Sequence, residues 1–274
     1  PDDILHFFPF ETLLTEENKK NWLIKKYQIA YAPSLSALRE IIQRRSKNGT
    51  GHHKDILAIG DPYLGQYEKE NPGSGGKDIL QDFYSSSTFK FARLKYSGLE
   101  IERIASLFKA KDTDILKRKR ASEDELKKCG LSDYKIIHFA THSLIDDKKP
   151  ARSSILLSLN PEAEEDGFLQ MREIFNLKLH AELVVLSACQ TGLGQFIRGE
   201  GIEGLSRAFF YAGASSVLMS LWAVNDQASY QLMERFYSRL RSSDSPITAL
   251  QKAKWDLINS DLLSHPYYLS LIHI

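Results

Sequence analysis

The sequence predicts an α/β protein in which helices cover both faces of a mostly parallel sheet. Short apolar runs alternate with amphipathic stretches along the chain, which is typical of strand–helix–strand units with right-handed crossovers. Two of the apolar runs lead directly into polar turns built from small residues, as buried strands do in such sheets. The 274 residues, 42% of them hydrophobic, suffice for a sizeable core without disulfides or metals.

The first part of the chain shows this alternation most simply. We expect strands at residues 25–32 and 55–59, separated by an amphipathic helix at residues 34–45. The apolar face of that helix consists of Leu35, Leu38, Ile41 and Ile42. Residues 61–91 are rich in Gly, Ser, Lys and Asp, so we expect a mobile loop there.

The same pattern continues toward the C-terminus. Further helices are expected at residues 99–108, 122–129, 171–175, 204–212 and 225–240. Two further strands are expected to end at Ala140 and at Ser187. Two more are expected at residues 153–159 and 216–221. Gly213 should end one helix, Asn225 should cap the next, and Ser245-Pro246 should begin the last.

Two segments contain the residues that point to chemistry. His138-Phe139-Ala140-Thr141-His142-Ser143 completes one apolar run, and residues 183–192 place Cys189 directly after another. The carboxyl ends of parallel strands open onto one crevice, so residues just past Ala140 and Ser187 should face a common cavity. A thiol needs such a neighbour, because the thiolate attacks and an imidazole accepts and returns the proton. The pattern therefore predicts acyl transfer through a thioester.

A purely structural interpretation competes with this one. Free cysteines are commonly buried packing residues, and a histidine at a strand end is commonly a hydrogen-bonded polar group. The equivalent strand-end positions of His142 and Cys189 favour catalysis. So does the glycine-containing turn at residues 190–194, whose backbone N–H groups can point at an oxyanion. The pair alone leaves the two interpretations about equal.

Four segments follow one another in a characteristic order. They are His-Phe-Ala-Thr-His-Ser from His138, Val-Val-Leu-Ser-Ala-Cys-Gln-Thr-Gly from Val184, Gly-Glu-Gly-Ile-Glu-Gly-Leu-Ser-Arg-Ala-Phe from Gly199, and Ser-Leu-Trp-Ala-Val-Asn-Asp-Gln-Ala from Ser220. Together they resemble the CHAT domain, a family of caspase-like cysteine peptidases related to separase. Weaker segments such as Gly60-Asp61-Pro62 extend the resemblance over nearly the whole chain.

The resemblance implies a caspase-like three-layer sandwich over residues 1–268, with Cys189 as nucleophile and His142 as proton shuttle. It also implies an oxyanion hole formed by the backbone N–H groups of Ser143 and Cys189. Ser143 replaces a glycine that is common in the family, and a serine is costly where φ must be positive. Because the family is often fused to tetratricopeptide repeats, an upstream repeat region is an expected partner.

Three acidic residues are candidates for substrate binding. Asp226 resembles the residue that lines the first specificity pocket in separase-like relatives, which implies cleavage after Arg or Lys. An aspartate in the first turn of a helix also complements the helix dipole, and this alternative has equal weight. Glu200 and Glu203 follow the cysteine in a glycine-rich segment and either serve the same pocket or are solvated.

Two further features allow more than one interpretation. No third or fourth ligand accompanies His138 and His142, so a core role for His138 is favoured over metal binding. The basic run Lys117-Arg118-Lys119-Arg120 is best explained as a solvated loop, because it lacks the interleaved aromatic residues of a nucleic-acid patch. A self-cleavage site is the remaining interpretation of this run.

Both ends of the chain need their own interpretation. Residues 1–6 resemble the turn after the family's first strand, so that strand is expected upstream of Pro1. Residues 269–274 depart from the family and match the translation of CTG TCT CTT ATA CAC ATC, a transposon end used in sequencing libraries. We therefore expect a non-native tail at residues 269–274 and exclude it from the predicted fold.

Composition narrows the class of function. The net charge of +1 gives no indication of nucleic-acid binding, and no apolar run is long enough to span a membrane. Cys129 and Cys189 form no disulfide framework, which favours a reducing, cytoplasmic location. No metal or organic cofactor is implied.

These observations predict a cysteine endopeptidase that cleaves protein substrates in a regulated signalling or defence role. Two alternatives remain open, namely a catalytically silent interaction module of the same fold and a redox-sensing thiol protein. An electrophilic probe preceded by basic residues separates them, since only a peptidase should label Cys189 in a manner that depends on His142.

Overall fold

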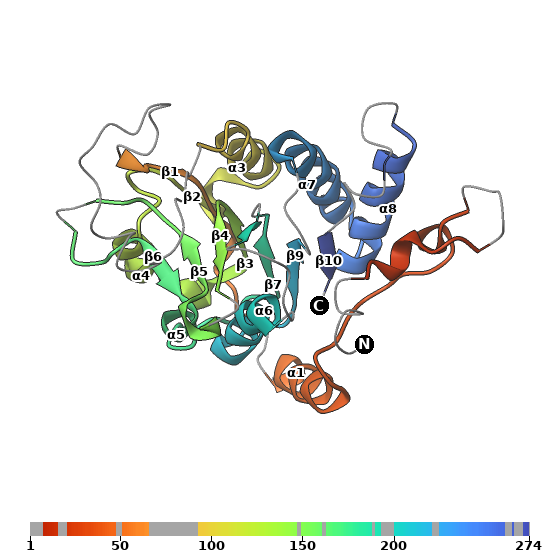
Figure 1. Cartoon of the computed structure of the whole chain (residues 1–274), viewed down its shortest axis with the longest axis horizontal. Coiled ribbons are helices and arrows are strands. Elements are labelled where there is room, and N and C mark those ends of the chain that lie inside the picture. Colours follow the sequence, from red (N-terminus) through yellow and green to blue (C-terminus); the bar gives the residue numbers. More distant parts are fainter. Residues whose placement is uncertain are drawn as a thin grey trace.

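Buried aliphatic strands form the centre of the structure, a computed structural model (Figure 1). It describes residues 8–15, 21–47, 51–65, 93–146, 149–160, 163–187, 190–192, 200–220, 225–260, 265 and 271–273. The central sheet has the strand order β10-β9-β7-β3-β1-β2. Its parallel strands are β1 (Lys54–Pro62), β2 (Thr113–Arg118), β3 (Tyr134–Ala140), β7 (Leu183–Leu186) and β9 (Val217–Ser220). The predicted parallel sheet is therefore confirmed.

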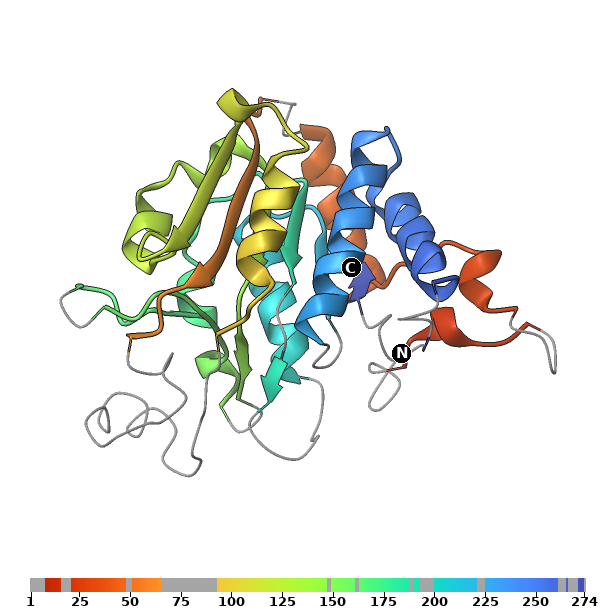
Figure 2. The ribbon, with the colours of Figure 1, turned by 90° about the horizontal axis from the view of Figure 1, so that it is seen from above.

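Helices cover both faces of this sheet. One face bears α3 (Ser97–Ala105), α7 (Asp226–Arg241) and α8 (Pro246–Ile258), and the other bears α4 (Glu123–Lys128), α5 (Met171–Ile174) and α6 (Glu200–Ala212). Figure 2 shows α3 and α7 side by side along their face of the strands. Neighbouring residues of β1 point to opposite cores, because Ile56 packs with α7 and α8 whereas Leu57 packs with α4 and α6. The predicted three-layer sandwich is confirmed.

Local sequence signals fix several helix ends as expected. The side chain of Asn225 caps α7, and the hydroxyl of Ser245 accepts the Thr248 N–H at the start of α8. Gly213 ends α6 with φ at 123°, a conformation that side chains rarely adopt. A Cβ at this position would lie 1.9 Å from the carbonyl oxygen of Leu179, so only glycine fits.

A second, four-stranded sheet lies next to the central one. Its order is β6 (Phe168–Gln170), β5 (Ser154–Leu156), β4 (Ser143–Ile145) and β8 (Gln190–Gly192). In this region the sequence predicts a strand only at residues 153–159, which is longer than the observed β5. Three-residue strands are too short to show a hydrophobic period, so this sheet and its pairing were missed.

The strand predicted at residues 25–32 is wrong. The chain forms a short 3₁₀ helix at Leu23–Lys25 and then runs without regular structure to residue 33. The carbonyl oxygens of Ile24 and Tyr27 accept hydrogen bonds from the Gln251 side chain of α8, at 2.6 and 3.1 Å. A side chain satisfies these backbone groups, so no strand partner is needed.

The helix predicted at residues 34–45 is confirmed as α1 (Leu35–Lys47), but its apolar face is only partly buried. Ile41 packs against the core on the α6 side, and Arg44 donates to the Ala214 carbonyl at 3.0 Å. Leu35 and Ile42 remain 85% and 56% exposed. The shared apolar side of the helix was correctly predicted, but only part of it packs against the core.

Two further expectations need revision at loops. The predicted loop at residues 61–91 begins later, because β1 continues to Pro62, and residues 66–92 lie outside the described residues. The basic run does not form a simple loop, because Lys117 and Arg118 are the last residues of β2, a strand that was not predicted. β2 is an edge strand of the central sheet, so part of the run belongs to the sheet edge, where Lys117 pairs with Glu102 at 2.7 Å.

The C-terminal tail also has a place in the fold. Leu271–His273 form β10, which pairs antiparallel with β9, so that Ile272 lies opposite Met219. The exclusion of residues 269–274 from the fold is therefore wrong for these three residues. Their proposed non-native origin is a separate question and stays a prediction.

Candidate active site

The ends of β3 and β7 lie next to each other at one edge of the central sheet. The two strands pair in parallel, with Phe139 opposite Leu186, and the Ser187 N–H donates to the Phe139 carbonyl at 2.9 Å. The prediction that the histidine strand and the cysteine strand are adjacent and parallel is confirmed.

A second pairing aligns the chain beyond these strand ends. β4 begins directly after His142, and β8 begins directly after Cys189. These strands also pair in parallel, with Ser143 opposite Gln190. The described chain is thus aligned on both sides of the two candidate positions. Cys189 itself lies outside the described residues, so the approach of its sulfur to the His142 ring stays a prediction.

The backbone around His142 is held by β5. The His142 carbonyl accepts the Leu156 N–H at 2.9 Å, and the Thr141 hydroxyl donates to the Leu156 carbonyl at 2.5 Å. His142 is almost fully buried, at 4% exposure. These hydrogen bonds fix the backbone from which the imidazole projects. A proton shuttle requires such a fixed position.

Ser143 lies in the extended backbone of β4. Among the described residues other than glycine, positive φ angles occur at Asp61, Arg118 and Ser243. Ser143 is not one of them, so a serine carries no conformational penalty at this position. Its replacement of the family's usual glycine is therefore compatible with the fold. The proposed use of its N–H in an oxyanion hole stays a prediction.

His138 is a core residue, as the sequence analysis favoured. Its Nδ1 lies 3.0 Å from the Tyr237 hydroxyl and its Nε2 lies 2.9 Å from Glu100 Oε1. All three side chains are buried, and they connect β3 to α3 and α7. Both ring nitrogens are engaged in this network, which explains the residue without a metal.

Asp226 joins two helix starts at the same edge of the sheet. It is the first residue of α7, and its Oδ2 accepts the Tyr96 N–H at 2.7 Å, just before α3. Burial raises the pKa of this carboxyl, and the nearby charges of Glu100 and Asp61 add to the effect. The residue therefore has a structural role, and its proposed contact with substrate stays a prediction.

Glu200 and Glu203 lie in the first turn of α6. Their side chains are outside the described part of the structure, so the direction in which they point is untested. Gly204, the next residue, lies against α5, because a Cβ there would approach the Met171 sulfur to 2.8 Å. The start of α6 is thereby fixed at close distance to α5.

A cluster of carboxylates lies between α4, α5 and the segment before β6. Lys127 Nζ lies 2.8 Å from Glu123, 2.7 Å from Glu165 and 3.1 Å from Glu173. Burial, followed by the neighbouring Glu173, raises the pKa of Glu123 to about 8. Among the described residues, these three glutamates are the one group of three or more His, Cys, Asp or Glu side chains whose ligand atoms lie close enough together to hold a metal ion. The Lys127 ammonium lies among their carboxylates.

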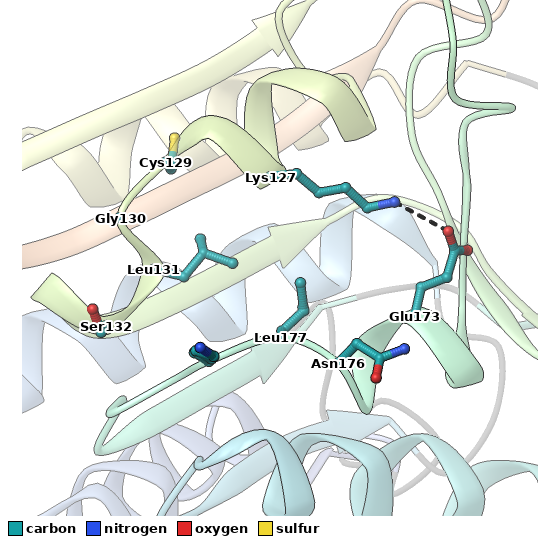
Figure 3. Close-up of a pocket in the computed structure, with 9 residues that line it drawn as sticks. Lys127, Cys129, Gly130, Leu131, Ser132, Glu173, Asn176 and Leu177 are labelled. Atoms are coloured by element: carbon teal, nitrogen blue, oxygen red, sulfur yellow. Dashed lines mark hydrogen bonds and ion pairs between the residues drawn. The ribbon is translucent and has the colours of Figure 1, made fainter.

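Cys129 lies at the wall of a different depression. A pocket of about 560 Å³ between α4 and the end of α5 is lined by Cys129, Leu131, Glu173, Asn176 and others (Figure 3). Its lining includes none of the candidate site residues. Burial raises the pKa of the Cys129 thiol, which lowers the thiolate fraction at neutral pH. This environment fits the packing role predicted for Cys129.

One buried acid at the candidate site's edge of the sheet was not predicted from the sequence. Asp61 follows Gly60, which lies so close to β3 that a Cβ would be 3.0 Å from the Ala140 carbonyl oxygen. Its carboxylate accepts hydrogen bonds from Arg93 at 2.8 and 2.9 Å and from Arg118 at 3.2 Å. A polar residue close to the end of a buried apolar strand was the available signal, as it was for His142.

Comparisons with known proteins agree with this geometry. The family model of the CHAT domain matches residues 1–271. Tetratricopeptide repeat protein 28 of Mus musculus is 36% identical over 98 residues, and that of Homo sapiens is 36% identical over 102 residues. These alignments cover 36% and 37% of this chain and 4% of each relative, so the chain spans a small part of their length. None of the described helices has the length and apolar character needed to cross a bilayer.

Proposed function

Because this chain belongs to the CHAT domain family, whose model matches residues 1–271, we propose that it is a cysteine endopeptidase. Cys189 is the nucleophile and His142 is the proton shuttle. The observation that supports this assignment is the double pairing of the flanking strands, β3 with β7 and β4 with β8. This double pairing aligns the chain before and after Cys189 and His142. Two residues that act together on one substrate atom require such alignment.

The reaction proceeds in two steps. His142 takes the proton of the Cys189 thiol, and the thiolate attacks the carbonyl carbon of the scissile peptide bond. The backbone N–H groups of Ser143 and Cys189 stabilise the oxyanion of the tetrahedral intermediate. The intermediate then expels the amine, which receives the proton from His142. Water, activated by the same imidazole, hydrolyses the thioester and releases the acid and the free thiol.

Cleavage after a basic residue is the proposed specificity. The Asp226 carboxylate lies at the sheet edge to which β3 and β7 lead, where burial, and after it the nearby charges of Glu100 and Asp61, raise its pKa. An acidic region of this kind favours a guanidinium or ammonium side chain. Glu200 and Glu203, at the start of α6, are the second source of negative charge in this proposal.

A catalytically silent interaction module is the second candidate. The relatives are named as tetratricopeptide repeat proteins, and the aligned part is 4% of their length. Repeats of this type stack helices into extended binding surfaces. An upstream repeat region is therefore a proposed partner of this domain. The proposed location is the cytoplasm, where the domain acts on other proteins.

An electrophilic peptide probe with Arg before the warhead tests the proposal. We expect the probe to label Cys189 in the wild-type chain and to lose most of this labelling in the His142→Ala variant. Mass spectrometry of the labelled peptide distinguishes Cys189 from Cys129. Equal labelling in the presence and absence of His142 would favour the redox-sensing alternative, and no labelling of Cys189 would favour the interaction module.

A further inference from the structure

Two tyrosine rings lie against each other where α3 and α7 begin. Tyr96 directly precedes α3, and Tyr230 lies in the second turn of α7. The rings stack at a centroid distance of 6.0 Å with an interplanar angle of 27°. Both tyrosines are half-buried, whereas Leu99, three residues after Tyr96, is 52% exposed. We call Tyr96, Leu99 and Tyr230 the tyrosine platform.

Leu99 lies on the outward side of α3. Ile101 and Ile104 of the same helix are fully buried and face the sheet. Residues three apart on a helix share a side, so Leu99 lies next to Tyr96 and faces away from these isoleucines. A single exposed leucine is common on a protein surface. Here it extends the surface of an aromatic pair, so the tyrosine platform is an apolar area rather than an isolated side chain.

Polar contacts between α3 and α7 hold the tyrosine platform in place. Figure 2 shows the two helices side by side. Asp226 accepts the Tyr96 N–H at 2.7 Å, and Arg103 pairs with Glu234 at 2.8 Å further along both helices. Asp226, Tyr230 and Glu234 follow at four-residue intervals and therefore line one side of α7. The ring pair thus lies between two polar contacts on rigid elements, which suits a binding surface.

The tyrosine platform lies at the candidate active site's edge of the sheet. The Ser97 hydroxyl accepts the Asp61 N–H at 3.1 Å, so α3 begins beside the end of β1. β1 pairs with β3, which leads to His142. α7 begins with Asp226, which we propose as the specificity residue. Tyr230 is therefore one helical turn beyond the proposed contact for a basic side chain.

An apolar side chain is the ligand that this surface fits. Contact with two rings and a leucine removes apolar area from water on both partners. A charged or amide side chain would lose hydration on the same surface without gaining a hydrogen bond from Leu99.

The spacing along α7 indicates where in a substrate this side chain stands. Four residues of a helix rise about 6 Å. Two residues of an extended chain span about 6.6 Å and place their side chains on the same side. The residues before the scissile bond stay attached to the enzyme in the thioester, so they are the ones to be held.

We propose that the tyrosine platform binds an apolar side chain of a polypeptide substrate, two positions before the basic residue that Asp226 receives. Tyr96, Leu99 and Tyr230 are then specificity residues in addition to Asp226. This inference rests on the proposed function, namely cleavage after a basic residue.

The test is a binding measurement with the Cys189→Ala chain, in which the proposed cleavage cannot occur. Two fluorescent peptides contain one central Arg and differ only two positions before it, where one has Leu and the other has Ser. Fluorescence anisotropy gives the dissociation constant of each peptide. We expect the Leu peptide to bind about tenfold more tightly, as for an apolar side chain that is largely removed from water.

Variants of the tyrosine platform locate the effect. Tyr230→Ala and Leu99→Ser should each reduce the tenfold ratio to about threefold or less, because apolar contact is lost. Tyr230→Phe keeps the ring and should keep the ratio. Leu99→Ser changes an exposed side chain, so it remains informative if Tyr230→Ala fails to fold by circular dichroism. Tyr211→Ala is the matched control, because Tyr211 is 75% exposed on α6, across the sheet, and its ring lies 5.3 Å from that of Phe175.

Three results would overturn the inference. The first is equal binding of the Leu and Ser peptides to the Cys189→Ala chain. The second is a ratio that falls as much with Tyr211→Ala as with Tyr230→Ala and Leu99→Ser. The third is a preference for Leu only when it stands after the Arg.

Peptidase activity of the wild-type chain is measured separately. A preference for Leu without any cleavage would refute the proposed function and leave the binding role of the tyrosine platform standing. Cleavage after Arg without a preference for Leu would refute the role of the tyrosine platform and leave the proposed function standing.

Discussion

Ser143 and Gln190 lie opposite each other in the parallel strands β4 and β8. Each follows directly after a candidate catalytic residue, so the pairing fixes the two chains where they leave the central sheet. The central sheet alone aligns Phe139 with Leu186 and leaves the following turns free to diverge. The second sheet therefore explains how short turns from neighbouring strands can be kept in register at one site.

The first prediction concerns the proposed catalytic pair. Cys189→Ala and His142→Ala should each abolish peptide cleavage, and the double variant should lose little more, because the two residues act as one unit. The measurement is kcat/KM on an Arg-containing peptide, with circular dichroism and urea unfolding to show that the fold persists. Cys189→Ala protein that still cleaves would refute the assignment.

Cys129→Ala is the matched thiol control for this experiment. Cys129 packs half-buried at the end of α4, and burial raises its thiol pKa, so its side chain is a poor nucleophile. We expect activity within about twofold of wild type and a loss of stability of about 1 kcal/mol, as for a small apolar group. A large loss of activity would direct attention to the pocket that Cys129 lines.

The sequence contains enough information for four strands of the central sheet but not for its edge strands β2 and β10 or for the neighbouring sheet. β1, β3, β7 and β9 are continuous apolar runs, and such runs identify buried strands. β4, β6 and β8 have three residues each and show no period, so only the fold positions them. For the same reason the sequence identified His142 but not the β4–β8 pairing beside it.

Side-chain networks were similarly beyond the sequence. His138 was correctly placed in the core, yet its partners Glu100 and Tyr237 come from α3 and α7, far away along the chain. Asp61 and its two arginines also join three separate segments. Long-range polar contacts depend on how helices lie on the sheet, and hydrophobic periodicity contains no information on them.

The second prediction concerns specificity at Asp226. Asp226→Asn should lower kcat/KM for a substrate with Arg before the scissile bond about tenfold to a hundredfold, since a charged hydrogen bond is replaced by a neutral one. The same variant should change cleavage after Ala very little. An unchanged ratio between the Arg and Ala substrates would exclude Asp226 as the specificity residue and leave Glu200 and Glu203 to be tested.

The stability of the Asp226 variants separates the structural role from the specificity role. Burial raises the pKa of Asp226 in the folded state, so the stabilisation due to its protonated form is lost as the pH rises above 3.8. Asp226→Asn keeps an oxygen that accepts the Tyr96 N–H and should be as stable as wild type at pH 7, or slightly more stable. Asp226→Ala loses that acceptor and should be destabilised by about 1–3 kcal/mol.

The third prediction concerns the carboxylate cluster around Lys127. The pKa of Glu123 is raised from 4.5 to about 8, so the folded chain keeps a proton that the unfolded chain releases in this range. Stability should therefore fall as the pH rises from 4.5 to 8, by a few kcal/mol at most. Glu123→Gln should flatten this dependence in urea unfolding at pH 5, 7 and 9.

Glu125→Gln on the same helix is the control for the Glu123 variant. Glu125 is 41% exposed and pairs with Lys128 at 3.1 Å, so its removal should shift stability by less than about 1 kcal/mol at each pH. Parallel pH profiles of Glu123→Gln and wild type would contradict the proton assignment.

The fourth prediction concerns the tail, whose Leu271–His273 pair with the edge of β9. Truncation after residue 268 should expose that edge, lower the free energy of unfolding by about 1–3 kcal/mol and increase self-association, because unpaired strand edges recruit other chains. Ile272→Pro should reproduce part of the effect in the chain of 274 residues, since proline cannot donate to a ladder and fits a strand poorly. Ile272→Val keeps the N–H and the β-branched shape and serves as the control. Urea unfolding and size-exclusion chromatography measure both effects. If the truncated chain unfolds at the wild-type urea concentration and remains monodisperse, β10 contributes nothing, and the tail behaves as the non-native extension that its sequence predicts.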